Sequence, residues 1–383
     1  MSLGARRLHC VKRRGSASHR DAPQLEGPCI FRSRLHHHSV AKRIAIVGAG
    51  VSGLTCGVAF VERGYPITIF AKGFGQQTTS GVAAAVWFPY DAEPAEKVIP
   101  WALRTFDALV DLARVPESGV SMIETRQFLR SNEIEIPDWA IPLGAQPLPV
   151  VIPSEVEGSR CAGFKVSPRD PSTPPAYAGS AQDDHCFASG FSLRVPLMDT
   201  TIYLDYLAAR LLKAGGEIHA NVRFQNLEEV DPKFELVINC AGIGARELVR
   251  DHDLEPHRGQ VAIVPRIEGL SCAIVCDDAP LMYAIPRMND CVFGGTNEVS
   301  DNLAPDPATR QRIVAECSRV LNIDSPRVLA ERVGLRPFRI SGVRLERDHL
   351  RDGRTVIHNY GHGGSGFTLS WGCAREVLEL AML

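Results

Sequence analysis

The clearest pattern of apolar and polar positions in the chain begins at Arg43. Residues 44 to 47 are all apolar, in a run short enough for a buried strand, and residues 66 to 70 form a second apolar run. A glycine-rich turn and a largely apolar stretch of helical length lie between the two runs. The pattern predicts a strand, turn, helix and strand within a unit of about 30 residues.

The turn of this unit has the spacing of a dinucleotide-binding loop. Gly48 permits a tight turn, Gly50 lets the backbone approach a pyrophosphate, and Gly53 lets the helix pack closely on the strand. The first amides of the helix can bind the anion. We therefore predict a cofactor site formed by Gly48, Ala49, Gly50, Val51, Ser52 and Gly53.

The second strand lacks the acidic residue that commonly binds the ribose in such units. Phe70, Ala71 and Lys72 stand where that residue is expected. The ribose must therefore be bound by another part of the chain. A lysine here can indicate a ribose 2′-phosphate, but we interpret Lys72 as a solvated charge.

A second glycine-rich segment lies near the C-terminus. It follows an apolar strand predicted at 355 to 357 and precedes a helix predicted at 371 to 382. Glycines in this context allow a backbone to approach a flat ligand. The segment predicts a second contact with the cofactor.

Composition narrows the class of protein. The chain has 383 residues, 45% of them hydrophobic, which suits one large domain or two interleaved domains. A net charge of -2 gives no cationic excess for nucleic acid, and no apolar run is long enough to span a membrane. The eleven cysteines show neither C-x-x-C pairs nor zinc-site spacing, so we expect reduced core thiols and no metal site.

Two segments differ from the rest. Residues 1 to 41 are basic and lack a periodic apolar face, so we expect a disordered or non-native N-terminal extension, with a transit peptide as the alternative. Residues 147 to 184 are rich in Pro, Ser and Gly, which predicts an inserted surface loop. The final residues, ELAML, do not resemble a peroxisomal S-K-L signal, and we expect a cytoplasmic protein.

Six segments in order resemble the D-amino-acid oxidase family. They are VGAGVSGL (47–54), TTSGVAAAVWFPY (78–90), VINCAGIGA (237–245), RGQVAIV (258–264), GLRPFR (334–339) and HNYGHGGSGFTLSWGCA (358–374). The resemblance runs from about Arg43 to the C-terminus, without the insertion. It implies FAD as cofactor and an α/β (α+β) fold, in which a Rossmann-like FAD-binding domain is interleaved with an antiparallel-sheet substrate domain. The predicted FAD-binding domain comprises residues 42–100, 192–247 and 337–383, and the substrate domain comprises 101–191 and 248–336.

The resemblance also implies the site residues. Arg336 would bind the substrate carboxylate through a bidentate fork, Tyr283 would reach the same carboxylate, and Gly364 would lie by the flavin ring and the substrate amine. No acid-base catalyst is expected, and His358 and His362 are interpreted as structural. The remaining residues expected to contact FAD are Thr78, Thr79, Ala84, Ala85, Val86, Gly242, Gly363, Gly366, Phe367 and Thr368.

The implied activity is oxidative deamination of neutral D-amino acids, with dioxygen as the second substrate. This chain departs from the family at three positions of the site, one of which is Ser365, where the family often has a bulky residue. Ala279 replaces a tyrosine of the mammalian-type members, for which Arg287 or the insertion is a possible substitute. Asn297 follows the Gly-Gly-Thr at 294 to 296, where the D-aspartate-oxidising branch has an arginine. The alternatives are a glycine/sarcosine-type oxidase, a D-aspartate oxidase, a nicotinamide dehydrogenase and an inactive flavoprotein. The sequence does not decide whether the protein forms a homodimer.

Overall fold

The computed structural model describes residues 42–130, 135–148 and 187–383. The predicted N-terminal extension at 1–41, and almost all of the predicted insertion at 147–184, lie outside the described residues. The described residues all belong to one unit, Ala41–Leu383, so the interleaved domain boundaries stay a prediction.

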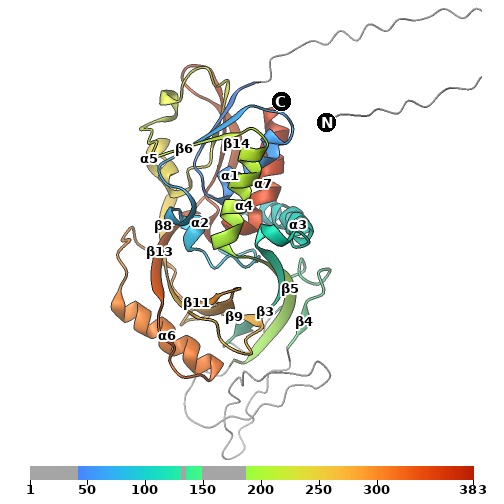
Figure 1. The fold of residues 1–383 in the computed structure, drawn as a ribbon, viewed down its shortest axis with the longest axis vertical. Helices are drawn as coiled ribbons and strands as arrows, with labels where there is room; N and C mark the ends of the chain where they lie inside the picture. The colour runs from blue at the N-terminus through green and yellow to red at the C-terminus, as the bar shows by residue number, and fades with distance from the viewer. Residues whose placement is uncertain (1–41, 131–134, 149–186) are drawn as a thin grey trace, which may run out of the picture. The chain divides into compact units, whose positions relative to one another are not determined.

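The first layer is a six-stranded sheet built on the predicted strand, turn, helix and strand (Figure 1). Its order is β14-β15-β7-β1-β2-β6, and all neighbours are parallel except β14 and β15. The bounds are β1 Ile44–Val47, β2 Ile67–Ala71, β6 Glu217–Ala220, β7 Leu236–Asn239, β14 Arg344–His349 and β15 Thr355–Tyr360. A parallel sheet places the carboxyl ends of β1, β7 and β15 at one edge, which is where ligands bind in such folds.

The second layer is a nine-stranded sheet of order β12-β8-β11-β10-β9-β3-β5-β4, with β13 also paired to β8. The bounds are β3 Val120–Leu129, β4 Gln146–Pro147, β5 Ser189–Met198, β8 Leu254–Pro265, β9 Cys272–Cys276, β10 Met282–Pro286, β11 Asp290–Gly294, β12 Glu298–Val299 and β13 Ala330–Arg339. The pairs are antiparallel except β3 with β9, which is parallel. The predicted fold class is confirmed, with this one parallel pair as a departure.

Alternation along these strands separates the two faces of the nine-stranded sheet. Val261 and Val292 belong to the apolar core shared with the helices of the first layer. Ala262 and Phe293 belong to a second core beneath helix α6 (Pro307–Leu321). We call the first the cavity face, because Gly259, Val261 and Tyr283 on it line the cavity described below.

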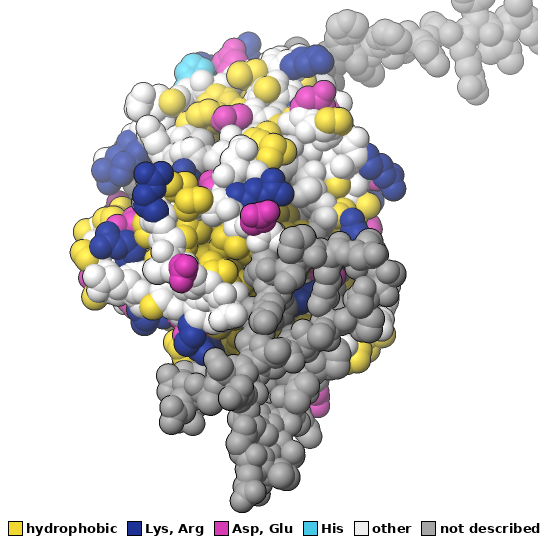
Figure 2. All heavy atoms as spheres, turned by 60° about the horizontal axis from the view of Figure 1, so that its bottom comes forward, with side chains coloured by type: hydrophobic (Ala, Val, Ile, Leu, Met, Phe, Trp, Pro, Cys, Tyr) yellow, Lys and Arg dark blue, Asp and Glu magenta, His cyan; other side chains and the backbone are white. Residues whose placement is uncertain are grey.

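The outer surface carries charges of both signs. On the face shown in Figure 2, Lys and Arg side chains are interspersed with Asp and Glu side chains and with apolar patches. None of the helices in the described part of the chain is long and apolar enough to cross a membrane.

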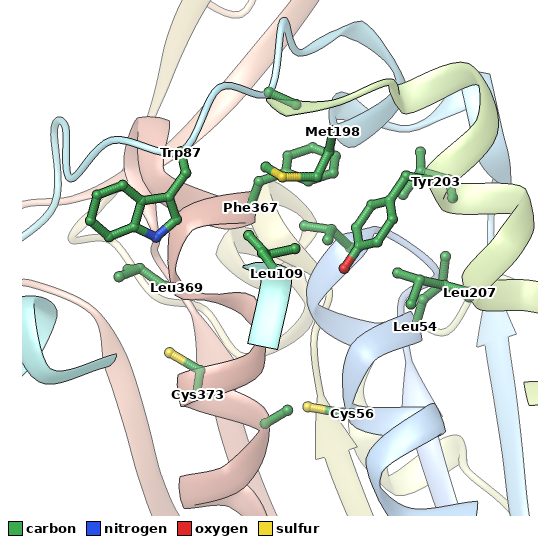
Figure 3. Packing of buried hydrophobic residues seen from close by; sticks show 14 of the residues in the cluster. Leu54, Cys56, Trp87, Leu109, Met198, Tyr203, Leu207, Phe367, Leu369 and Cys373 are labelled. Atoms are coloured by element: carbon green, nitrogen blue, oxygen red, sulfur yellow. The ribbon is translucent and has the colours of Figure 1, made fainter. Parts of the chain in front are cut away.

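Four long helices pack together. They are α1 Val51–Val61, α3 Ala95–Leu112, α4 Thr200–Lys213 and α7 Gly366–Ala381, and two short helices, α2 Thr79–Val82 and α5 Ala245–Leu248, lie in loops. Helices α1, α4 and α7 contact the six-stranded sheet, and α3 packs on α7 and against β3 and β5. Figure 3 shows Leu54 of α1, Tyr203 of α4 and Phe367 of α7 pointing into one interior. Trp371 donates a hydrogen bond of 2.9 Å to the buried Tyr203 hydroxyl, which satisfies that polar group.

The cysteines agree with the prediction of reduced core thiols. All seven in the described residues are free and buried. Three of them, Cys56, Cys240 and Cys373, lie in the core between α1, β7 and α7.

Candidate functional site

The glycines of the first turn allow contacts that a side chain would prevent. Gly48 has φ +112°, and a Cβ there would lie 2.2 Å from the Cys240 carbonyl oxygen on the neighbouring strand. A Cβ on Gly53 would lie 1.9 Å from the Gly48 carbonyl oxygen. These two glycines therefore let β1, β7 and α1 meet closely, and they leave the turn's backbone bare toward the ligand side.

Ser80 of α2 contacts this turn, and the sequence reasoning missed it. Its Oγ accepts a hydrogen bond of 3.0 Å from the Val51 amide at the start of α1. It also lies 3.1 Å from where a Cβ on Gly50 would be. Its place in the Thr78–Thr79–Ser80 run was the only signal in the sequence.

The hydroxyls of Thr78 and Thr79 are bonded within the protein. Thr78 accepts from the Gly81 amide as the N-cap of α2 and donates to the Gly75 carbonyl oxygen at 2.7 Å. Thr79 donates to the Leu335 carbonyl oxygen at 3.2 Å, which ties α2 to β13. Both residues line the cavity, but their hydroxyls already have partners.

A cavity of about 620 Å³ joins the first turn to the nine-stranded sheet. The predicted residues that line it are Gly48, Ala49, Gly50, Val51, Ser52, Thr78, Thr79, Gly242, Tyr283, Arg336, Gly363, Gly364, Gly366 and Phe367. The cavity therefore brings the two glycine-rich segments together with both predicted carboxylate-binding residues.

Five predicted contacts are not among the lining residues, and they have packing roles instead. Ala84 and Ala85 are buried, and Val86 bridges to Leu197 of β5. Thr368 is buried and bonds to the Phe88 backbone in both directions, donating at 3.0 Å and accepting at 3.2 Å. Gly53 packs on the turn as described above.

Although the second strand lacks the expected acidic residue, charged side chains from other segments line the cavity. Lys72 lines the cavity, and so do Arg223 and Glu247, which form an exposed ion pair of 3.2 Å. Arg223 follows β6 and Glu247 lies on α5. No spacing rule connects these residues to the turn, and the sequence alone could not have found them.

Helix α7 begins at Gly366, five residues before the predicted start at Trp371. Its N-cap, Ser365, makes no side-chain capping bond, because its hydroxyl bonds with the Tyr90 backbone. Gly366 and Phe367 line the cavity, so the positive end of the helix faces it.

Arg336 and Tyr283 meet above two glycines of the nine-stranded sheet. A Cβ on Gly259 would lie 2.6 Å from the Arg336 guanidinium, and one on Gly294 would lie 2.0 Å from the Tyr283 ring. Burial raises the pKa of Tyr283, and the adjacent Arg336 guanidinium opposes that shift. The glycines thus provide the space in which a cation and a hydroxyl converge.

Asn297 holds Arg336 in place and connects it to Tyr90. The Arg336 guanidinium donates to the Thr296 carbonyl oxygen at 2.9 Å and to the Asn297 side-chain oxygen at 3.3 Å. The Asn297 amide donates to the Tyr90 hydroxyl at 3.2 Å. Burial raises the pKa of Tyr90 to about 12, so Tyr90 is neutral near pH 7. A Cβ on Gly364 would lie 2.5 Å from the Tyr90 ring, so Tyr90 also packs on the second glycine segment.

A buried acid lies behind this group. Asp91 Oδ2 is 3.4 Å from His257 Nδ1, and His257 is the cross-strand partner of Arg336. Burial raises the pKa of Asp91, while His257 and Arg336 lower it. Asp91 therefore lies near enough to His257 and Arg336 for their charges to act on its carboxyl group.

The other candidate polar groups have structural partners. His358 contacts the Asn239 amide at 3.3 Å and His362 contacts Asn359 at 3.0 Å, and burial lowers the pKa of each histidine to about 4. Arg287 forms an ion pair of 2.7 Å with Asp290 and is not among the lining residues. Within the described ranges, no three His, Cys, Asp or Glu side chains gather as a metal site would require.

Comparison with known proteins supplies a family match. Residues 43–380 match the profile of a family described as FAD dependent oxidoreductase. A D-amino-acid oxidase of Rubrobacter xylanophilus is 38% identical over 346 residues, which cover 89% of this chain and 96% of that protein. The human D-aspartate oxidase is 32% identical over 355 residues, which cover 88% of this chain and 94% of that protein.

Solved structures show the same fold at low identity. Glycine oxidase from Geobacillus kaustophilus aligns with a TM-score of 0.67 at 16% identity, covering 89% of this chain and 95% of that one. The L-alpha-glycerophosphate oxidase of Mycoplasma pneumoniae, solved with FAD bound, aligns with a TM-score of 0.64 at 15% identity, covering 90% of this chain and 95% of that one.

Proposed function

Because the chain belongs to the FAD-dependent oxidoreductase family, we propose that it is a D-amino-acid oxidase acting on neutral D-amino acids. The observation that carries the proposal is the meeting of Arg336 and Tyr283 at the cavity that also contains both glycine-rich segments. A guanidinium and a phenol hydroxyl suit a carboxylate, and the glycine segments suit a dinucleotide.

The residues present fit FAD. The bare backbone of Gly48 and Gly50 and the start of α1 would hold the pyrophosphate. The amides of Gly366 and Phe367 would face the pyrimidine end of the flavin, where negative charge develops on reduction. Because the Thr368 hydroxyl is bonded to Phe88, we assign this role to the α7 amides alone.

Binding geometry would supply most of the catalysis. When bound, FAD accepts a hydride from the substrate α-carbon and passes electrons to dioxygen, which gives hydrogen peroxide. Arg336 would bind the carboxylate through its fork, and Tyr283 would donate its hydroxyl to the same group. Gly364 is exposed between buried neighbours, and its carbonyl would accept a hydrogen bond from the substrate amine. With the carboxylate and the amine held in this way, only one stereoisomer would direct its α-hydrogen toward the flavin.

No side chain in this arrangement needs to act as a general acid or base. His358 and His362 are buried, paired and neutral at pH 7 because burial lowers the pKa of each to about 4. The released imino acid hydrolyses in water to a 2-oxo acid and ammonia.

A D-aspartate oxidase is the second candidate, favoured by the human relative at 32% identity. A second substrate carboxylate requires a second cation near Arg336. Arg336 bonds to the neutral Asn297 amide, and Arg287 is paired with Asp290. These contacts favour neutral over acidic substrates.

The test is an anaerobic spectrum of the purified protein with D-alanine, L-alanine or D-aspartate. Bleaching of the flavin band by D-alanine alone is the expected result. Bleaching by D-aspartate alone would move the assignment to the second candidate, and a flavin band that no D-amino acid bleaches would refute both. We further propose a cytoplasmic location, in keeping with the seven free thiols of the described residues.

A further inference from the structure

We propose that Asp91 and His257 are positioning residues for Arg336, and that this pair takes up a proton when a substrate carboxylate binds to the Arg336 guanidinium. The inference rests on the proposed function, because it requires Arg336 to bind the carboxylate. Neither Asp91 nor His257 is among the site residues expected from the sequence. Substrate binding becomes dependent on pH as a result.

Strand register places His257 beside Arg336. The two residues are partners across the antiparallel strands β8 and β13, so their side chains leave the same face of the sheet, with Cβ atoms roughly 5 Å apart. Gly259, two residues along β8, lies on this face and lines the cavity. A Cβ on Gly259 would lie 2.6 Å from the Arg336 guanidinium. His257 therefore lies on the cavity face, next to the arginine that would bind the substrate.

The imidazole of His257 lies between two carboxylates. Its Nδ1 is 3.4 Å from Asp91 Oδ2, and its Nε2 is 3.7 Å from Glu255 Oε2. The ring stacks on the Phe338 ring with 4.4 Å between the centroids, which orients it. A neutral imidazole has one N–H and a protonated imidazole has two, so protonation gives each ring nitrogen a donor toward a carboxylate.

The contact between Asp91 and His257 is not a hydrogen bond. The two facing atoms, Asp91 Oδ2 and His257 Nδ1, are buried, and neither has a hydrogen-bond partner among the described residues. A buried polar atom without a partner destabilises the fold. A proton shared by the two side chains would satisfy both atoms at once.

Asp91 is held against the second glycine-rich segment. Gly363, which lines the cavity, leaves room for Asp91, since a Cβ on Gly363 would lie 1.8 Å from the Asp91 carbonyl oxygen and 3.5 Å from Oδ2. Burial raises the pKa of Asp91, and the charges of His257 and Arg336 oppose that shift. The carboxylate of Asp91 therefore has a defined position, and the Arg336 charge acts on it.

Charge balance couples the pair to the ligand. In the described part of the chain, the acceptors bonded to Arg336 are the Thr296 carbonyl and Asn297 side-chain oxygens, which are both neutral. A bound carboxylate therefore adds a negative charge close to that of Asp91. Like charges in a partly buried site raise each other's affinity for protons, and a proton on the Asp91–His257 pair removes the repulsion.

The other groups around His257 leave this proton to the pair. Three titratable residues of neighbouring segments are neutral near pH 7 because of burial, namely Tyr90, with a pKa of about 12, Tyr283, with a raised pKa, and His362, with a pKa of about 4. On β12 the partner of His257 is Val299, which is uncharged. The Glu255 side chain is 37% exposed, against 13% for His257 and 14% for Asp91, so solvent screens its charge more.

The test is calorimetry of butanoate binding to the holoenzyme. Butanoate carries the carboxylate but lacks an α-amine, so it cannot be oxidised. Titrations in pairs of buffers with different ionisation enthalpies give the number of protons taken up, and they would run between about pH 6 and 8, where histidine side chains change charge. We expect a peak of roughly half a proton, the value for a tenfold rise in proton affinity. By reciprocity, Kd should be about tenfold lower at the acid end of the range.

Variants assign the proton. His257→Gln should abolish the uptake in this range, and Asp91→Asn, which removes the facing carboxylate, should move its peak to lower pH. His219→Gln is the matched control and should keep the uptake, because His219 also pairs with a carboxylate, Glu217 at 3.3 Å, but is exposed and lies outside the cavity lining. If His257→Gln does not fold, His257→Phe keeps a ring on Phe338 and must abolish the uptake as well.

Butanoate binding without proton uptake, or an uptake unchanged in His257→Gln, would overturn the inference and leave the role of Arg336 standing. If butanoate does not bind and D-alanine does not bleach the flavin, the proposed function fails with it. If D-alanine is oxidised although butanoate does not bind, the pH profile of KM decides. Between the same pH limits, KM for D-alanine should rise about tenfold in the unmodified protein and stay within about twofold in His257→Gln, and equal profiles would refute the pair's role.

Discussion

Replacing Arg336 with methionine should reduce kcat/KM for D-alanine by about 10² to 10⁴-fold. The guanidinium can give a carboxylate two charge-assisted hydrogen bonds of about 1.5–3 kcal/mol each, together about 3–6 kcal/mol. Each 1.36 kcal/mol of transition-state stabilisation corresponds to a tenfold change in rate. Methionine keeps an unbranched chain above Gly259 but donates no hydrogen bond.

Arg336→Lys keeps the positive charge but removes the paired N–H donors of the guanidinium, so it tests the two contributions separately. Lysine keeps a cation but offers a point donor, so we expect the loss of about one charge-assisted bond, or roughly 10 to 150-fold. The same substitution should also release Asn297, since the Arg336 guanidinium bonds to its side-chain oxygen at 3.3 Å. The drop should appear mainly in KM if the lysine still orients the substrate, and in both kcat and KM if it does not.

The assay is peroxide release under steady-state conditions, with flavin content measured on each preparation. Arg344→Met is the matched control, because Arg344 bonds to the Tyr360 hydroxyl at 2.8 Å and to Glu346, and lies outside the cavity lining. Its kcat/KM should stay within about threefold of the unmodified protein. A loss below tenfold in a flavin-loaded Arg336→Met protein would refute the carboxylate assignment.

Three further changes test the geometry. Gly48→Ala would put a Cβ 2.2 Å from the Cys240 carbonyl oxygen at a residue with φ +112°. The flavin content of the purified protein, measured by absorbance, should therefore be far lower, and an unchanged flavin content would contradict the assigned turn. Gly294→Ala would displace the Tyr283 ring, so KM for D-alanine should rise about tenfold while the flavin content stays unchanged. An unchanged KM would show that Tyr283 does not bind the substrate. For His362 the folded pKa of about 4 lies below the unfolded value, so the unfolded state binds more protons and stability falls as pH falls below about 6.5. In urea unfolding, the contribution of His362 to the free energy of unfolding should be about 2 kcal/mol smaller at pH 5 than at pH 7. If the free energy of unfolding of the His362→Gln variant falls as steeply between these pH values, another group is responsible.

The first turn could be predicted because its signals are local. Strand β1 was predicted at its observed bounds, and the close contacts of Gly48 and Gly53 follow from the spacing of glycines in a strand, turn and helix. Arg336 and Tyr283 were carried by motif resemblance, and the cavity contains both. Their roles in binding stay predictions.

Other features depend on contacts that no local pattern encodes. Helix α7 starts at Gly366, although glycine is a poor helix former, and the preceding Ser365 is bonded to Tyr90 far away in the sequence. The pairing of Arg223 with Glu247 depends on two loops meeting at one edge of a sheet. The parallel pairing of β3 with β9 likewise joins strands that are distant in the chain.

The buried thiols have a consequence for an enzyme that would generate peroxide. Cys240 lines the cavity itself, beside the turn that would hold the cofactor. Its hydrogen bond with Cys56 and its burial raise the pKa of the Cys240 thiol well above the ordinary value, and burial does the same for Cys373. Peroxide attacks thiolates far faster than thiols, so these sulfurs would remain protonated and resist oxidation. The core of the protein would thereby withstand its own product over many turnovers.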